Sequence, residues 1–239
     1  MPTIAVQLAA LRAQMRAAEK RVGRPPESCS LLAVSKGVSA ERVAEAFDAG
    51  QRSFGENRVQ ELEEKRVALA QLRPESKVQW ELIGPLQSNK LRRAMVAADR
   101  IDSVDRMELL AKIVEASKAS PDRISIALQV NTDADSAKAG FAPEELRAAL
   151  PEVARLLRGT NVVIDGLMTI GRLTEDREES RRSVATFATF ATSLRAEAAN
   201  VALAIGPLLS AGMSGDFEVA IEEGATQVRL GSALFGARG

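Results

Sequence analysis

From residue 31 onward, short apolar runs alternate with longer segments of helical character. The eight runs cover residues 31–36, 52–56, 78–83, 100–104, 124–130, 162–167, 203–210 and 226–230. Short strands that are apolar along their whole length are typical of a parallel sheet covered by helices on both faces. Since no linker separates the eight units, we predict a single α/β domain over residues 1–239. It closes into a (β/α)8 TIM barrel rather than an open doubly wound sheet.

The segment before the first strand adds one helix to this plan. Ile4, Leu8, Leu11 and Met15 recur at helical spacing, and Pro25 follows the segment. This pattern predicts an amphipathic helix that packs against the barrel.

Two missing residue types restrict the chemistry of the chain. It has no histidine and no tyrosine among its 239 residues, and Cys29 is its single cysteine. Nucleophiles activated by histidine, histidine-ligated metals and a tyrosine acid or base are therefore excluded. One cysteine permits neither an intrachain disulfide nor a multi-thiolate metal site, so we predict no metal and a buried, inert thiol at Cys29.

The charge balance argues against large charged partners. The chain has 32 basic and 32 acidic residues, so its net charge is zero. No bulk field attracts nucleic acid or an anionic membrane. The first twenty residues lack the apolar core of a secretory signal, and no run is long enough to span a bilayer. We therefore expect a cytoplasmic protein.

The first predicted strand ends at Lys36, so a charged ammonium group follows the mainly apolar residues 31–35. Such a lysine can simply mark where the strand reaches the surface. In a (β/α)8 barrel, however, the carboxyl ends of the strands form the active face. Lys36 would stand there among amide and hydroxyl side chains such as Ser103, Asn131 and Thr132. Uncharged surroundings can lower the pKa of an amine and make it nucleophilic, which indicates Schiff-base chemistry.

The last two strands are followed by glycine- and serine-containing loops. Residues 210–215 read Ser-Ala-Gly-Met-Ser-Gly, and residues 229–232 read Arg-Leu-Gly-Ser. Ser214 and Ser232 can be ordinary helix N-caps. Loops seven and eight of this fold nevertheless often bind phosphate, through backbone N–H groups and a helix N-terminus. A reactive lysine facing a phosphate site fits two ligand classes, a sugar phosphate of an aldolase or pyridoxal 5′-phosphate (PLP).

Several segments together resemble one known family, the PLP homeostasis proteins of the YggS/PROSC type. The segments are Ala33–Lys36, Phe54–Glu61, Ile83–Lys90, Gln129–Thr132, Gly166–Thr169, Gly212–Phe217, Ile221–Thr226 and Arg229–Gly236. They occur in the family's order over residues 31–238. The resemblance implies the barrel of alanine racemase, the type III fold of PLP proteins.

The resemblance also implies the cofactor-binding residues. Lys36 would hold PLP as an internal aldimine. The phosphate would be bound by Ser214, Gly231 and Ser232. Arg229 would lie near the pyridine nitrogen, and Asn57 and Met168 would line the ring. Glu81 and Pro85 stand where relatives commonly have histidines, and Glu81 is expected to be a buried carboxylate that needs a partner.

These observations favour a PLP-binding protein that buffers or delivers the cofactor without robust catalysis. A racemase of this barrel type needs a second base, a tyrosine from another domain, and this chain has none. A weak amino-acid racemase or a Schiff-base aldolase is the alternative, and a scaffold that binds a partner through its surface helices is a third class. The expected partners are PLP and PLP-dependent apoenzymes, and the expected state is a monomer.

Overall fold

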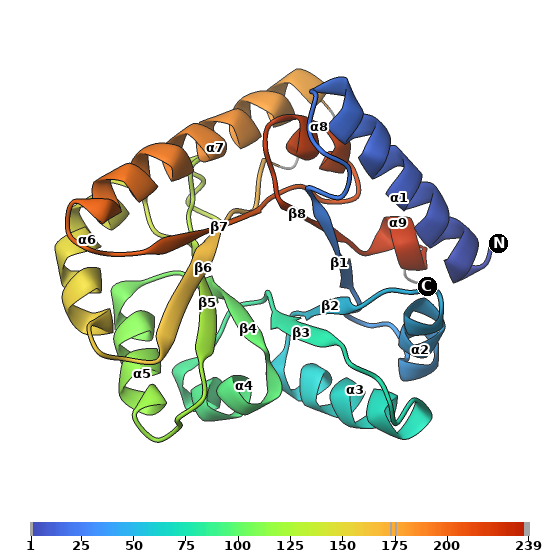
Figure 1. The fold of residues 1–239 in the computed structure, drawn as a ribbon, viewed down its shortest axis with the longest axis horizontal. Helices are drawn as coiled ribbons and strands as arrows, with labels where there is room; N and C mark the ends of the chain where they lie inside the picture. The colour runs from blue at the N-terminus through green and yellow to red at the C-terminus, as the bar shows by residue number, and fades with distance from the viewer. Residues whose placement is uncertain (1, 173, 175, 237–239) are drawn as a thin grey trace.

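The computed structural model describes residues 2–172, 174 and 176–236, and shows a closed barrel of parallel strands (Figure 1). The strands are β1 (Ser30–Val34), β2 (Ser53–Glu56), β3 (Gln79–Leu82), β4 (Arg100–Val104), β5 (Ile124–Gln129), β6 (Val162–Met168), β7 (Ile205–Ser210) and β8 (Gln227–Leu230). Each strand pairs with its neighbour in chain order, and β8 pairs with β1 to close the barrel. The predicted (β/α)8 fold is confirmed.

Helices surround the barrel on its outer side (Figure 1). They are α1 (Ile4–Arg21), α2 (Ala40–Asp48), α3 (Val59–Leu72), α4 (Leu91–Ala97), α5 (Met107–Ser117), α6 (Pro143–Leu157), α7 (Arg177–Ala199), α8 (Phe217–Glu222) and α9 (Ser232–Phe235), with a 3-10 turn η1 (Ser88–Lys90) before α4. A helix follows each strand, as the right-handed crossover between parallel strands requires.

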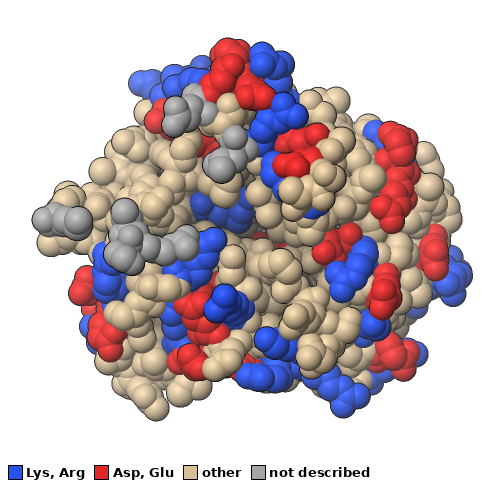
Figure 2. All heavy atoms as spheres, turned by 180° about the vertical axis from the view of Figure 1, so that it is seen from behind, with Lys and Arg blue, Asp and Glu red and all other residues tan. Residues whose placement is uncertain are grey.

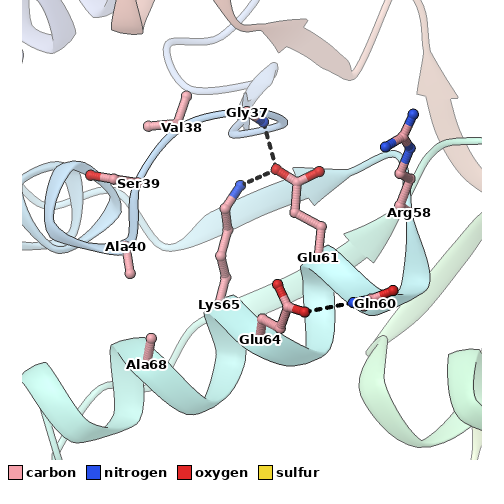
Figure 3. A pocket seen from close by; sticks show the side chains of 10 residues that line it. All are labelled: Gly37, Val38, Ser39, Ala40, Arg58, Gln60, Glu61, Glu64, Lys65 and Ala68. Carbon is pink, nitrogen blue, oxygen red and sulfur yellow. Dashed lines mark hydrogen bonds and ion pairs between the residues drawn. The ribbon is translucent and has the colours of Figure 1, made fainter.

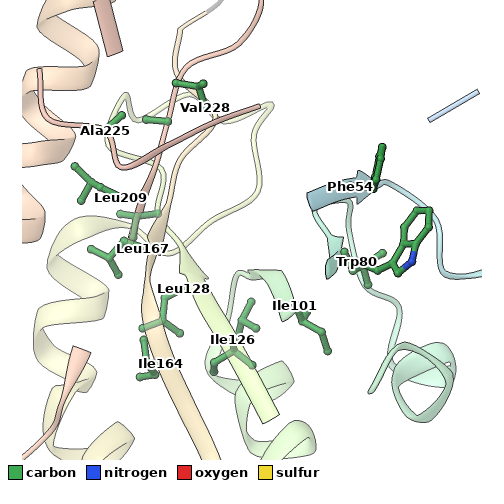
Figure 4. Packing of buried hydrophobic residues seen from close by; sticks show 14 of the residues in the cluster. Phe54, Trp80, Ile101, Ile126, Leu128, Ile164, Leu167, Leu209, Ala225 and Val228 are labelled. Carbon is green, nitrogen blue, oxygen red and sulfur yellow. The ribbon is translucent and has the colours of Figure 1, made fainter. Parts of the chain in front are cut away.

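The main apolar core fills the space between strands and helices. Ile126 and Leu128 of β5 and Ile164 of β6 are buried side by side, and Ile126 pairs in register with Ile164 (Figure 4). Phe54 of β2 lies against Trp80 of β3 with 5.5 Å between ring centroids. These residues point away from the barrel axis, so the alternate positions of each strand face the axis.

The N-terminal helix α1 packs on the outside of the barrel, next to α8 and α9 (Figure 1). Ile4, Leu8, Leu11 and Met15 are all buried, which confirms the predicted apolar face. Arg21 forms ion pairs at this contact with Glu218 and Glu222 of α8, which lie 197 and 201 positions away along the chain.

The seventh strand accommodates the Gly206-Pro207 pair through its neighbour β6. Ile164 pairs with Ile205 and Gly166 pairs with Leu208, so the register between β6 and β7 shifts at Asp165. A Cβ at Gly206 would lie 2.4 Å from the Asp165 carbonyl oxygen, so the two backbones approach too closely for a side chain. Pro207 cannot donate to the ladder, and a local irregularity is where a sheet tolerates it.

The outer surface agrees with the balanced composition. Acidic and basic side chains are interspersed over the face seen in Figure 2. Within residues 2–172, 174 and 176–236, the structure contains no helix with the length and apolar character that crossing a membrane requires. The same residues contain no cluster of His, Cys, Asp or Glu suited to a metal ion.

Candidate functional site at the carboxyl ends of the strands

The closed parallel barrel brings the predicted site residues to one rim. Lys36 follows β1, Asn57 follows β2, and Gly231 follows β8, and these three strands are neighbours. Met168 ends β6, one strand before the β7 loop that carries Ser214. All strands run in the same direction, so their carboxyl ends meet at the same end of the barrel.

Lys36 lies in the turn just beyond β1 and is half-buried. The ladder between β1 and β2 continues one residue past the strand, because Ser35 N donates to Gly55 O at 3.0 Å. The Ser35 hydroxyl is on the outer side, where it donates to Glu56 Oε1 at 2.6 Å. Lys36 follows Ser35 in this turn, at the rim of the barrel.

Asn57 is held by a close contact between two loops. A Cβ at Gly84 would lie 2.2 Å from Asn57 O, so only glycine allows this approach. Ser103 Oγ donates to Gly84 O at 2.7 Å and fixes the other side of the same loop. Pro85, which follows, is exposed. The half-buried Asn57 therefore has a defined position beside the end of β2.

The loops after β7 and β8 are joined to each other. Ser214 Oγ accepts from Ala233 N, in the first turn of α9, at 3.2 Å. Ser214 is not the N-cap of α8, since that position belongs to Asp216. Asp216 Oδ1 accepts from Met213 N at 2.6 Å, which closes the loop back on itself. The alternative that Ser214 is the ordinary cap of the helix following β7 is therefore wrong.

The β8 loop also approaches the lysine strand. A Cβ at Gly231 would lie 3.2 Å from Val34 O and 3.5 Å from Val34 Cβ. Gly231 is the N-cap of α9 and the exposed Ser232 is its first residue, so a helix begins here as predicted. The alternative that Ser232 is an ordinary N-cap is wrong, since Gly231 holds that position. The predicted phosphate loops thus lie beside the end of the strand that leads to Lys36.

Arg229 is buried on the axis side of β8, with 5% exposure. Its Nη1 donates to Ser210 Oγ at 3.0 Å and its Nη2 to Thr169 O at 2.7 Å, so both acceptors are neutral. Burial lowers the pKa of Arg229 below its ordinary value, while Asp102 acts in the opposite direction. These bonds tie β8 to the ends of β6 and β7, where Met168 is also buried.

A charged network lies deeper in the barrel. Arg100 Nη2 donates to Glu81 Oε2 at 2.7 Å, and Arg100 Nε donates to Asp102 Oδ1 at 2.6 Å. Gln227 Nε2 donates to both carboxylate oxygens of Glu81, at 3.1 and 3.0 Å. Burial, together with the charge of Asp102, raises the pKa of Glu81 to about 8. The expectation that Glu81 is buried and has partners for its carboxyl group is confirmed.

Sequence reasoning did not single out the partners of Glu81. Arg100 and Asp102 are two residues apart in β4, and Gln227 and Arg229 are two apart in β8. Polar residues at period two inside otherwise apolar strands indicate a polar face directed at the barrel axis. This spacing of polar residues was the feature of the sequence that could have indicated the buried network.

Comparison with known proteins agrees with this geometry. A family model described as "Alanine racemase, N-terminal domain" matches residues 6–239. The pyridoxal phosphate homeostasis protein of Pseudomonas aeruginosa is 41% identical over 238 residues, which cover 100% of this chain and 97% of that relative. The chain belongs to the pyridoxal phosphate homeostasis protein family. The family member from Vibrio alginolyticus is 35% identical over 238 residues, with 100% of this chain and 99% of the relative covered.

Solved structures extend the comparison of this family member. PipY of Synechococcus elongatus, described with PLP bound, has a TM-score of 0.83 at 39% identity and covers 98% of this chain and 100% of PipY. An alanine racemase from Clostridium difficile has a TM-score of 0.68 at 16% identity and covers 99% of this chain but 56% of the racemase. The latter likeness shows a common barrel alone, and it confirms the expected alanine racemase-like fold.

Proposed function

We propose that this protein binds PLP at the carboxyl ends of the strands, with Lys36 as the attachment point, and that it buffers or delivers the cofactor in vitamin B6 homeostasis. The observation that carries the proposal is the contact between the two predicted halves of the site. Gly231, which begins the α9 loop, packs against the last residue of the strand that leads to Lys36. PipY, whose structure is described with PLP bound, supports the choice of ligand.

The donor set of the rim fits this cofactor. A phosphate accepts hydrogen bonds, and Ser214, Ser232 and the backbone around Gly231 supply hydroxyl and N–H donors there. When bound, PLP supplies an aldehyde that condenses reversibly with a primary amine and a ring that can withdraw electrons. We assign the amine to Lys36, the phosphate contacts to Ser214, Gly231 and Ser232, and the flanks of the ring to Asn57 and Met168.

Arg229 supports binding without strong catalysis. Its guanidinium is buried beside Thr169 and Ser210, and its acceptors carry no charge that would cancel its own. A cation near the pyridine nitrogen opposes protonation of that nitrogen and so weakens the ring as an electron sink. The chain also contains neither tyrosine nor histidine as a second acid or base. The relatives above are named as homeostasis proteins.

The decisive experiment is a titration of the purified protein with PLP. We expect a visible absorbance band, and borohydride reduction followed by peptide mapping should find PLP on Lys36. A missing band, or one that persists in Lys36→Ala, would refute the proposal. Turnover of L- or D-alanine that disappears in Lys36→Ala would instead support the racemase alternative. The same preparation, measured by light scattering, tests the proposed monomer.

Delivery to PLP-dependent apoenzymes in the cytoplasm completes the proposal. The loaded protein should reactivate an apoenzyme faster than the Lys36→Ala protein mixed with the same total PLP. Equal reactivation by both would show that the protein does not deliver its cofactor.

A further inference from the structure

The turn that carries Lys36 is anchored on both sides of the lysine by one cluster of charged residues. We call Glu56, Glu61 and Lys65 the Lys65 cluster. Lys65 Nζ donates to Ser35 O, directly before Lys36. Glu61 Oε1 accepts from Gly37 N, directly after it, at 2.5 Å. Figure 3 shows the side chains of Lys65 and Glu61 reaching from α3 toward the Gly37 turn.

The cluster is held together by two ion pairs of Lys65, a buried one to Glu56 and a half-buried one to Glu61. Lys65 Nζ lies 2.7 Å from Glu56 Oε1 and 2.7 Å from Glu61 Oε1. The Lys65 side chain is 8% exposed and that of Glu56 is fully buried. Burial raises the pKa of Glu56 although Lys65 and Ser35 act against it. For Glu61, burial acts upward, but hydrogen bonds from Lys65 and Gly37 outweigh it and lower the pKa.

Lys65 is not placed to compete with Lys36 for an aldehyde. Its ammonium has three N–H donors, and three oxygens accept from it, those of Ser35, Glu56 and Glu61. Two of these oxygens belong to carboxyl groups of its own cluster and the third is a backbone carbonyl, so every donor of Lys65 is already used. The two lysines therefore have separate positions and separate tasks.

We propose that Glu56, Glu61 and Lys65 are positioning residues for Lys36, which hold its turn in the conformation that presents the amine to PLP. The inference rests on the proposed function. In the covalent step, the neutral amine nitrogen attacks the aldehyde carbon, a C=N bond replaces C=O, and the oxygen leaves as water with the two amine hydrogens. Ordering one backbone residue changes an equilibrium constant roughly tenfold, so a turn fixed in advance favours condensation.

The test compares two ligands on the full-length protein. PLP can condense with Lys36, whereas pyridoxine 5′-phosphate carries an alcohol instead of the aldehyde and can use only the noncovalent contacts. In Lys65→Met and Glu61→Ala we expect affinity for PLP to fall about tenfold, as the loss of a charge-assisted hydrogen bond implies, and affinity for pyridoxine 5′-phosphate to change less than about twofold. Glu61→Gln, whose amide oxygen can still accept from Gly37 N, should recover part of the PLP affinity.

Controls separate positioning from a general loss of structure. Lys112→Met removes an exposed lysine with the same i,i+4 pairing, to Glu108, and should bind both ligands as the wild type does. The double variant Lys65→Met/Glu56→Gln avoids leaving a buried carboxylate without its ion pair, and should show the same selective loss. An equal loss for both ligands, or no loss for PLP, would overturn the inference. If borohydride fixes no PLP to Lys36 in the wild type, the proposed function itself is refuted, whatever the variants show.

Discussion

Ser214 Oγ accepts a hydrogen bond from Ala233 N at 3.2 Å, although Ser214 lies in the loop after β7 and Ala233 in the helix after β8. The bond joins the segment after β7 to the first turn of α9. Both segments were expected to bind phosphate, and this contact places them together at the same rim as the turn of Lys36.

Replacement of Ser214 by alanine should weaken PLP binding more than it weakens the fold. The variant loses the acceptor for Ala233 N and a hydroxyl that we assign to the phosphate. One neutral hydrogen bond contributes about 1 kcal/mol, so a five- to tenfold weaker affinity is expected by absorbance titration. Thr186→Ala is a matched control, because among the residues that the structure describes the Thr186 hydroxyl bonds only to Arg182 O of its own helix. Identical affinities for the Ser214→Ala and Thr186→Ala variants would contradict the assignment.

The raised pKa of Glu81 predicts a pH dependence of stability. The pKa is about 8 in the folded protein against an ordinary 4.5. Between these values the folded state keeps a proton that the unfolded state releases, so the free energy of unfolding falls as the pH rises. The limiting slope for one proton is about 1.4 kcal/mol per pH unit.

Glu81→Gln isolates this contribution. The amide remains neutral at every pH, so urea unfolding between pH 5 and pH 8.5 should give a flatter dependence in the variant than in the wild type. Equal slopes for the two proteins would show that Glu81 does not hold its proton in the folded barrel.

Gly84→Ala should disturb the loop that fixes Asn57. The added Cβ would lie 2.2 Å from Asn57 O and 2.6 Å from Asn57 Cα, and both are backbone atoms that cannot rotate away. We expect the free energy of unfolding to fall by about 1–3 kcal/mol in urea denaturation. Gly215→Ala is the control, because its Cβ would meet no atom of the described part of the chain within 4 Å. A Gly84→Ala protein as stable as this control would contradict the close packing.

Cys29 should be unreactive in the folded protein. Its side chain is buried with 5% exposure, and burial raises the pKa of the thiol to about 12. Because the thiolate is the reactive form, iodoacetamide at pH 8 should leave the native protein unmodified and label it fully in urea. Rapid alkylation under native conditions, followed by mass spectrometry, would refute the predicted burial.

The barrel could be predicted from the sequence because its evidence is local. Each short apolar run and each helical spacing identifies one element without reference to the others, and the number and order of elements then favour closure. The α1 face from Ile4 to Met15 follows directly from such spacing. The rim position of Lys36 also follows, since it depends only on where β1 ends.

Contacts between distant residues could not be obtained in this way. Glu81 meets Gln227 across 146 positions of the chain, and their pairing depends on how the closed barrel brings β3 and β8 to a common interior. Ser214 looked like the cap of the next helix because a hydroxyl before a helix commonly is one. Only the folded loop directs it to α9 instead.

The sequence by itself therefore determined the architecture, the position of Lys36 after the first strand and the loops that follow the last two strands. Tertiary structure alone decided how the lysine turn is held, because Lys65 contacts the backbone before Lys36 and Glu61 contacts the backbone after it. Alternation, strand order and helix spacing are properties of neighbouring residues. Buried ion pairs and hydrogen bonds between separate loops exist only after closure has removed the groups from water and set the register between strands.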